Sequence, residues 1–228
     1  DVDYDQLVIA TGSVGTTFGI PGVEEHALQM KSIADARRIK MRLLNTYEEV
    51  QEGRLPRETL RVVVVGGGPT GMTLALQLKR FGITCRLIEK RPKEPSGSKA
   101  LSVNPASLTL LNDLGVANDL VAVGHKTDVI NLLYHNQPLT RARFAKLPSK
   151  YPYFLMLPQP DTEAVLEQRL NDLDQHIERD CELLGLQPHS DHVEVELREG
   201  NQTRRQRFAY VVGCDGGLSK VRNELGLS

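Results

Sequence analysis

Gly66, Gly68 and Gly71 have the spacing of a phosphate-binding turn. They form a G-x-G-x-x-G pattern that follows four consecutive valines and precedes a run of helical character. In such a turn the first glycine permits a tight bend, the second lets a pyrophosphate approach the backbone, and the third lets helix and strand pack closely. The helix that starts at Pro69 and Thr70 would offer the free N–H groups of its first turn and the positive end of its dipole to the phosphates, although Pro69 itself has no N–H.

A carboxylate follows at the distance that this motif requires. Residues 85–89 are predicted to form a strand that ends in Glu89, 18 residues after Gly71. An acid at this place can accept a hydrogen bond from a ribose 2′-OH, and its charge repels a 2′-phosphate. The pattern therefore favours FAD or NAD over NADP, although Lys90 and Arg91 soften the repulsion. The alternative is a glycine-rich strand-to-helix turn that binds no ligand.

Composition argues against several classes of protein. The 228 residues carry a formal net charge of −1 and 40% hydrophobic residues, which is ordinary for a globular protein and indicates neither nucleic acid nor a membrane surface as a partner. No apolar run approaches the ~20 residues of a membrane span. The three cysteines and the isolated histidines lack metal-ligand spacing, so we expect no metal site and reduced thiols in a cytoplasmic protein.

The remaining elements predict an α/β fold with an insertion. A helix with Pro105 at its first position is expected to begin after Asn104, and Ser219 is expected to cap a short helix near the C-terminal end. We expect Asp161 to cap a helix that runs to about Leu173. The other predicted strands are 129–134, 139–144, 153–157, 182–186, 193–197 and 208–212. The hairpin-like middle predicts a Rossmann-like FAD/NAD(P)-binding fold with inserted antiparallel strands, because a plain NAD domain alternates strands and helices throughout.

The N-terminal part predicts a separate segment. Residues 4–12 are typical of a buried strand, 33–51 of an amphipathic helix, and 52–59 of a linker. We therefore divide the chain into an N-terminal strand-loop-helix segment, residues 1–58, and an FAD-binding domain, residues 59–228. Because Val8 and Ile9 are too apolar for a free tail and the helix has an apolar stripe, we expect both elements to pack on the sheet of the second part.

From about residue 61 onward the chain resembles class A flavin-dependent monooxygenases, the group of phenol and aromatic hydroxylases. The segments 65–78 with 87–90, 97–115, 157–166 and 210–226 carry the resemblance.

This resemblance implies a role for single residues. Glu89 would hold the FAD ribose, and Gln159 would contact the chain of the flavin. Lys99 stands where the family usually has an arginine and would reach the pyrophosphate without a bidentate fork. Asp215 would lie where flavin and nicotinamide cofactors meet, in a turn that Arg222 braces. The structural alternatives are a capping role for Gln159 and an Asx-turn for Asp215.

Residues 1–71 resemble type II NADH dehydrogenases. Residues 4–13, 18–27 and 66–71 carry this second resemblance, in which the glycine turn would open an NAD domain. The chain is thus similar to a junction of two flavoprotein families. A natural fusion, a recombinant chimera and a misassembled sequence all agree with that pattern.

The first resemblance implies an FAD-dependent oxidoreductase that hydroxylates an aromatic or phenolic small molecule with NAD(P)H and O2. The family's later Gly-Asp motif and most of its substrate region do not occur before Ser228. We therefore expect an incomplete active site, and no catalytic acid, base or nucleophile is identified. The alternatives are the NAD-binding half of an NADH:quinone-type oxidoreductase and a non-catalytic dinucleotide-binding fragment.

Overall fold

The computed structural model describes residues 41, 44–54, 61–92, 100–135, 137–189 and 192–226. The strand predicted at 4–12 lies outside the described residues. Of the helix predicted at 33–51, residues 44–51 are helical. This helical piece packs on the rest of the chain, since Val50 is buried and the Thr46 hydroxyl lies 3.1 Å from the Tyr210 hydroxyl.

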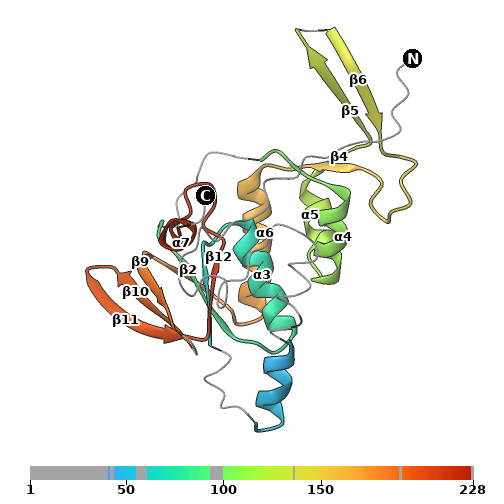
Figure 1. The fold of residues 1–228 in the computed structure, drawn as a ribbon. Coiled ribbons are helices and arrows are strands. Elements are labelled where there is room, and N and C mark those ends of the chain that lie inside the picture. Colours follow the sequence, from blue (N-terminus) through green and yellow to red (C-terminus); the bar gives the residue numbers. More distant parts are fainter. Residues whose placement is uncertain are drawn as a thin grey trace.

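A parallel sheet lies at the centre of the chain (Figure 1). Strands β1 (Val62–Val65), β2 (Cys85–Glu89), β8 (Ile177–Arg179) and β12 (Tyr210–Gly213) have the order β12-β1-β2-β8, with every neighbouring pair parallel. Helix α3 (Pro69–Arg80) connects β1 to β2. The predicted strand-turn-helix-strand unit and the Rossmann-like α/β fold are confirmed.

The four valines of β1 explain why this strand is central. Val62 and Val64 belong to one hydrophobic core, whereas Val63 and Val65 belong to a second core on the opposite face of the sheet. Successive side chains of a strand point to opposite faces, so a strand that is buried on both faces must be apolar throughout. A carboxylate or cation in β1 would have no water on either side.

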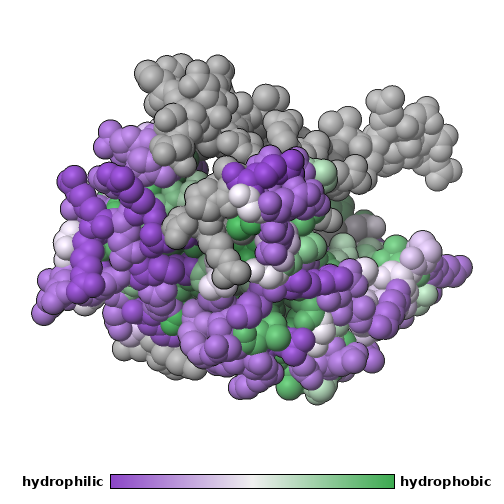
Figure 2. All heavy atoms as spheres, turned by 90° about the horizontal axis from the view of Figure 1, so that it is seen from below, coloured by the Kyte–Doolittle hydropathy of each residue, from purple (hydrophilic) through white to green (hydrophobic). Residues whose placement is uncertain are grey.

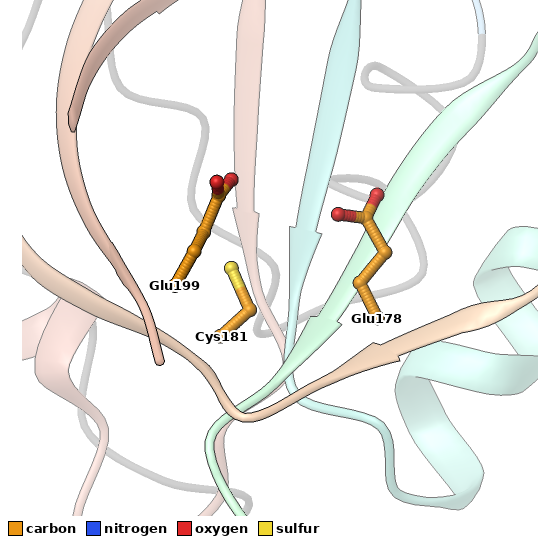
Figure 3. A group of neighbouring side chains, drawn as sticks. All are labelled: Glu178, Cys181 and Glu199. Carbon is orange, nitrogen blue, oxygen red and sulfur yellow. The ribbon is translucent and has the colours of Figure 1, made fainter. Parts of the chain in front are cut away.

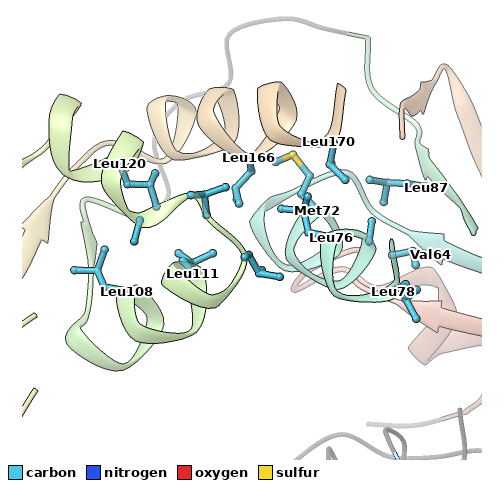
Figure 4. Packing of buried hydrophobic residues seen from close by; sticks show 14 of the residues in the cluster. Val64, Met72, Leu76, Leu78, Leu87, Leu108, Leu111, Leu120, Leu166 and Leu170 are labelled. Atoms are coloured by element: carbon cyan, nitrogen blue, oxygen red, sulfur yellow. The ribbon is translucent and has the colours of Figure 1, made fainter. Parts of the chain in front are cut away.

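Four helices of the described residues share the core on the first face of the sheet, with α3 directly on the strands. They are α3, α4 (Pro105–Asp113), α5 (Ala117–Val123) and α6 (Gln159–Asp172). Figure 4 shows Met72 and Leu76 of α3 facing Leu166 and Leu170 of α6, and Leu111 of α4 continuing the same core. These contacts fix the start of α6 beside the glycine turn.

Antiparallel strands supply the second layer and the insertion. The other face of the parallel sheet packs on β9 (Cys181–Pro188), β10 (Val193–Glu199) and β11 (Gln202–Phe208), with α7 (Lys220–Glu224) beside them. The insertion contains β3 (Ser102–Val103), β4 (His125–Thr127) and β7 (Phe154–Met156) in one small sheet, and the hairpin of β5 (Val129–Tyr134) and β6 (Gln137–Arg143), which projects from the body (Figure 1). The predicted inserted antiparallel strands are confirmed.

Two expectations about elements were wrong, and some elements were not foreseen. The N-cap of α6 is Pro158, so Asp161 lies inside the first turn, where its charge still suits the helix dipole. The strand expected at 208–212 is two strands, because Phe208 pairs with Val193 in the antiparallel sheet while Tyr210 pairs with β1. Helix α5 and strand β8 were not predicted.

The surface seen from below is mainly hydrophilic among the described residues, with apolar side chains showing in small separate areas (Figure 2). Among the same residues, no helix combines the length and the apolar character that crossing a bilayer requires.

Candidate cofactor-binding site

The glycines of the turn after β1 are needed for different structural reasons. Gly66 has φ +112°, and a Cβ on it would lie 2.4 Å from the carbonyl oxygen of Cys214. A Cβ on Gly71 would lie 1.9 Å from the carbonyl oxygen of Gly66. A Cβ on Gly68, in contrast, would have Glu163 Oε1 at 4.0 Å as its nearest neighbour. The fold therefore requires Gly66 and Gly71, whereas Gly68 leaves open the side from which a pyrophosphate would approach.

The N-terminus of α3 opens toward the same place. Gly68 is its N-cap and Pro69 occupies the first turn, while Thr70 is exposed. No side chain among the described residues caps this end, and its first turn carries no acid. The first N–H groups of a helix have no partner within the helix, and together with the dipole they favour an anion. The geometry fits the diphosphate of a dinucleotide.

Gly67, which the motif treats as variable, links the turn to Glu89. Its N–H donates to Glu89 Oε2 at 2.9 Å, and a Cβ on it would lie 2.9 Å from the Cβ of Glu89. A third consecutive glycine was the only signal in the sequence for this role. Gly67 thus fixes where the carboxylate lies relative to the phosphate turn.

Glu89 lies at the end of β2 and is buried, with hydrogen bonds on both oxygens. Oε1 accepts from the backbone N–H and the Nε of Arg91, both at 3.0 Å. Burial alone would raise the pKa of this carboxyl, but the hydrogen bonds from Arg91 and Gly67 outweigh it and lower the pKa below its ordinary value. Glu89 is therefore ionised at neutral pH. Lys90 is exposed directly beside it.

Helix α6 brings two polar side chains toward the glycine turn. Gln159 begins the helix, its N–H donates to the carbonyl of Ala100 at 3.0 Å, and its Nε2 donates to Glu163 Oε1 at 2.7 Å. The N-cap of α6 is Pro158, and the contact of Gln159 with the flavin chain stays a prediction. Glu163 was not singled out from the sequence, because only the packing of α3 on α6 places it near Gly68.

The turn after β12 packs against the glycine turn. The N–H of Cys214 donates to the carbonyl of Val65 at 2.7 Å. The carboxylate of Asp215 accepts from the Ser219 hydroxyl and the Lys220 N–H, each at 2.6 Å, and from the N–H of Val221 at 3.2 Å. Asp215 therefore accepts hydrogen bonds from the first N–H groups of α7. This is a structural role, as was the Asx-turn that the sequence offered as the alternative to a cofactor contact.

Two further predictions concern the same neighbourhood. Ser219 accepts a hydrogen bond from the Arg222 N–H at 3.0 Å, as expected of an N-cap. The side chain of Arg222 donates to the carbonyl of Gly217 at 2.6 Å, so the predicted bracing of this turn is confirmed. Lys99 lies in residues 93–99, outside the described residues, and its place at the pyrophosphate stays a prediction.

Glu178, Cys181 and Glu199 form a second cluster of polar groups, shown in Figure 3. Their ligand-type atoms all lie within 4.8 Å of one another. The Arg86 guanidinium donates to both carboxylates, with Nε 2.8 Å from Glu178 and Nη2 2.8 Å from Glu199. Burial raises the pKa of Cys181 to about 11, so the thiol stays protonated. We interpret the cluster as an ion-pair network that joins the two sheets.

A cavity of about 460 Å³ lies at the amino ends of β1 and β2, away from the glycine turn at their carboxyl ends. Its walls include Arg61 and Thr84, which directly precede β1 and β2, and Tyr47 of the helical residues 44–51. Ligands of open α/β sheets bind outside the carboxyl ends of the strands, at the point where the strand order reverses. Here that point lies between β1 and β12, at the glycine turn, so we do not expect the nucleotide to occupy the cavity.

Fold and site together define a dinucleotide-binding flavoprotein domain. The sequence model of the family described as "FAD binding domain" matches residues 59–228, and the chain belongs to this family. The relatives that the chain matches are FAD monooxygenases of the aromatic-hydroxylase type. FAD is therefore its cofactor. The model described as "Pyridine nucleotide-disulphide oxidoreductase" also matches residues 1–116 and overlaps the first match at the glycine turn.

Individual relatives agree with this family. The chain is 36% identical over 169 residues to a 6-methylpretetramide 4-monooxygenase from Streptomyces rimosus, covering 73% of this chain and 30% of the relative. The structure is similar to that of p-nitrophenol 4-monooxygenase from Pseudomonas putida, with a TM-score of 0.68, 25% identity and coverage of 73% and 43%. For the anhydrotetracycline hydroxylase of Streptomyces rimosus the TM-score is 0.66, the identity 33% and the coverage 73% and 34%. The chain spans about a third of the length of the curated relatives that it matches.

Proposed function

We propose that this chain is the FAD-binding part of a monooxygenase that hydroxylates an aromatic or phenolic small molecule with NAD(P)H and O2. The observation that carries the proposal is the open N-terminus of α3 beside Gly68, with the ionised Glu89 at the end of the next strand. The names of the relatives support the substrate class, since they include hydroxylases of nitrophenol and of tetracycline-type compounds.

Each residue of the site has a proposed part. The N–H groups of Thr70 and Gly71, which follow Pro69, would face the diphosphate, and Glu89 would bond the adenosine ribose. Gln159 and Asp215 would border the flavin side of the site, and Lys99 the pyrophosphate. Bound FAD would carry electrons from NAD(P)H to oxygen, while the protein would supply binding, orientation and shielding from water.

Flavin retention tests this proposal directly. The purified chain is incubated with FAD, desalted and scanned, because bound flavin absorbs near ~450 nm whereas NAD does not. The expected result is stoichiometric flavin that survives desalting. NADH and NADPH oxidation is then followed with p-nitrophenol present, and hydroxylated product is sought by chromatography. A folded chain that retains no flavin at saturating FAD contradicts the proposal.

The second candidate is the NAD-binding half of an NADH:quinone-type oxidoreductase. The match of residues 1–116 to the pyridine nucleotide-disulphide oxidoreductase family favours it. This candidate predicts that NADH binds to the chain in the absence of flavin and that a quinone, not a phenol, accepts the electrons. Calorimetric titration with NADH and with FAD separates the two candidates.

We also propose the division into residues 1–58 and 59–228 and a cytoplasmic location. The family match that begins at residue 59 supports the division. The free and buried thiols of Cys85 and Cys181 suit a reducing compartment. Limited proteolysis checks the division, because the first cuts should fall between residues 52 and 60 and leave a stable C-terminal fragment.

A further inference from the structure

The carboxylate of Glu89 has no spare acceptor site in this structure. Oε1 accepts from the N–H and the Nε of Arg91, and Oε2 accepts from the Gly67 N–H at 2.9 Å and from Arg91 Nη2 at 3.4 Å. A carboxylate offers about four lone-pair sites. A ribose hydroxyl that bonds Glu89 must therefore displace a present donor. The guanidinium is the one that can leave, because Arg91 is 48% exposed and its Nη2 contact is the longest.

The same ion pair changes the charge that a nucleotide meets. Glu89 alone would repel a 2′-phosphate, which is why an acid at this position favours unphosphorylated adenosine. Here the Arg91 guanidinium cancels that charge at 3.0 Å. The hydrogen bond to Glu89 and the charge of Glu89 raise the pKa of Arg91, with a smaller contribution from the Glu163 carboxylate, so the guanidinium stays charged. Lys90, the intervening residue, is exposed and adds a second cation.

A displaced Arg91 would remain next to the ribose, because only one residue separates it from Glu89. Its planar guanidinium can bind a phosphate through two parallel hydrogen bonds, which a lysine cannot do. A 2′-phosphate would thus find a bidentate partner at the place where the acid alone would have repelled it.

We propose that Arg91 sets the nucleotide specificity at the end of β2. The site around Glu89 would then accept a 2′-phosphorylated adenosine diphosphate as well as the unphosphorylated form. The inference rests on the proposed binding of the adenosine part of FAD at Glu89. It makes Arg91 a specificity-determining residue that the G-x-G-x-x-G motif does not include.

Binding of ADP and of 2′-phospho-ADP to the 228-residue chain tests the inference. Both ligands are titrated at constant ionic strength, directly by calorimetry and by displacement of FAD. The wild-type dissociation constants should agree within about tenfold, a difference of about 1.4 kcal/mol. Arg91→Gln should weaken 2′-phospho-ADP by about tenfold or more and change ADP by less than about threefold, the loss of one charge-assisted contact.

Three variants make the result specific. Arg91→Lys keeps the charge without the fork and should fall between wild type and Arg91→Gln. Glu89→Gln should shift the preference further toward 2′-phospho-ADP. Arg205→Gln removes an exposed cation from β11, where Arg205 pairs with Glu194, and should leave both affinities unchanged. Thermal melting of each variant confirms that it is folded.

The outcomes are distinguishable. A wild-type chain that binds ADP and excludes 2′-phospho-ADP by more than about a hundredfold, roughly 2.7 kcal/mol, overturns the inference and leaves the proposed function intact. The same holds if Arg91→Gln leaves the ratio of the two affinities unchanged. A folded chain that binds neither FAD nor ADP overturns both.

Discussion

The helices α3 and α7 follow the neighbouring strands β1 and β12, but among the described residues side chains cap only the N-terminus of α7. At α7 the side chains of Asp215 and Ser219 accept the first N–H groups. At α3 the N-cap is Gly68, and no described side chain takes that role. An anionic ligand gains from the open end and would be repelled at the closed one. We therefore expect the diphosphate of the cofactor at the N-terminus of α3 and not at that of α7.

Gly71→Ala should have the largest effect, because it breaks the packing that both turns share. The new Cβ would overlap the backbone carbonyl of Gly66, and backbone atoms cannot move aside as a flexible side chain can. We expect a loss of at least about 3 kcal/mol in the free energy of unfolding, measured by urea denaturation. Gly217→Ala in the other turn is the control, since its Cβ would have no neighbour within 4 Å. Equal stability of the two variants would contradict the glycine geometry.

Gly68→Val should separate binding from folding. Its Cβ meets no close neighbour in the chain, yet the branched side chain would stand in the path of the diphosphate. Urea denaturation should show nearly wild-type stability, while FAD affinity should fall by about a hundredfold, roughly 2.7 kcal/mol. Fluorescence titration of FAD gives the affinity. Normal flavin binding in this variant would exclude Gly68 from the site.

Glu89→Ala should weaken FAD by roughly 1–3 kcal/mol, the scale of a hydrogen bond to a charged acceptor. The same titration measures it, with Glu167→Ala as the control, because Glu167 lies further along α6 and pairs with Arg179. Unchanged affinity in Glu89→Ala would place the ribose elsewhere.

Asp215→Ala sharpens the comparison at the closed helix start. Loss of its three hydrogen bonds should lower the free energy of unfolding by about 1–2 kcal/mol, the usual range for an N-terminal cap. Because we also propose that Asp215 borders the flavin, FAD affinity should fall as well. Ser219→Ala should lower stability by about 1 kcal/mol without changing affinity. If the two variants differ in stability alone, Asp215 has no cofactor role.

The smallest effect should be a pH dependence that Glu89 contributes. Its pKa is lower in the folded chain than the ordinary 4.5, so its stabilisation is fully present above that value and is lost as the pH falls through the folded pKa. Unfolding free energies measured between about pH 6 and pH 3 should decline less steeply in Glu89→Gln than in wild type. Identical slopes would mean that Glu89 and Arg91 do not form the ion pair in solution.

The elements that carry a local signal could be predicted from the sequence. The valines of β1, the cap at Asn104 and the glycine turn each depend on neighbouring residues, and the structure has them as expected. Strand β8 could not be predicted, because Ile177–Arg179 contains one apolar residue and becomes a strand by pairing with Leu87 and its neighbours. The N-cap of helix α5 is Val116, whose apolar side chain makes no capping hydrogen bond that could mark the start of the helix.

The site, too, combines residues that have a local sequence signal with residues that only tertiary packing brings together. Gly68 and Glu89 follow from spacing within one strand-helix-strand unit. Glu163 approaches Gly68 because α6 packs on α3, a contact between segments far apart in the sequence. The bond pattern of Asp215 depends on where α7 begins, and the saturation of Glu89 by Arg91 depends on side-chain geometry, so neither could be derived from residue types alone.

The cysteines of this chain have a consequence for its chemistry with oxidants. Burial raises the pKa of Cys85 to about 11 and that of Cys214 to about 12, the latter helped by the charge of Asp215. At neutral pH no more than about one thiol in ten thousand would then be a thiolate, the form that attacks peroxides. Cys214 can therefore fill the space behind the glycine turn, next to the proposed FAD site, and still resist conversion to a sulfenic acid.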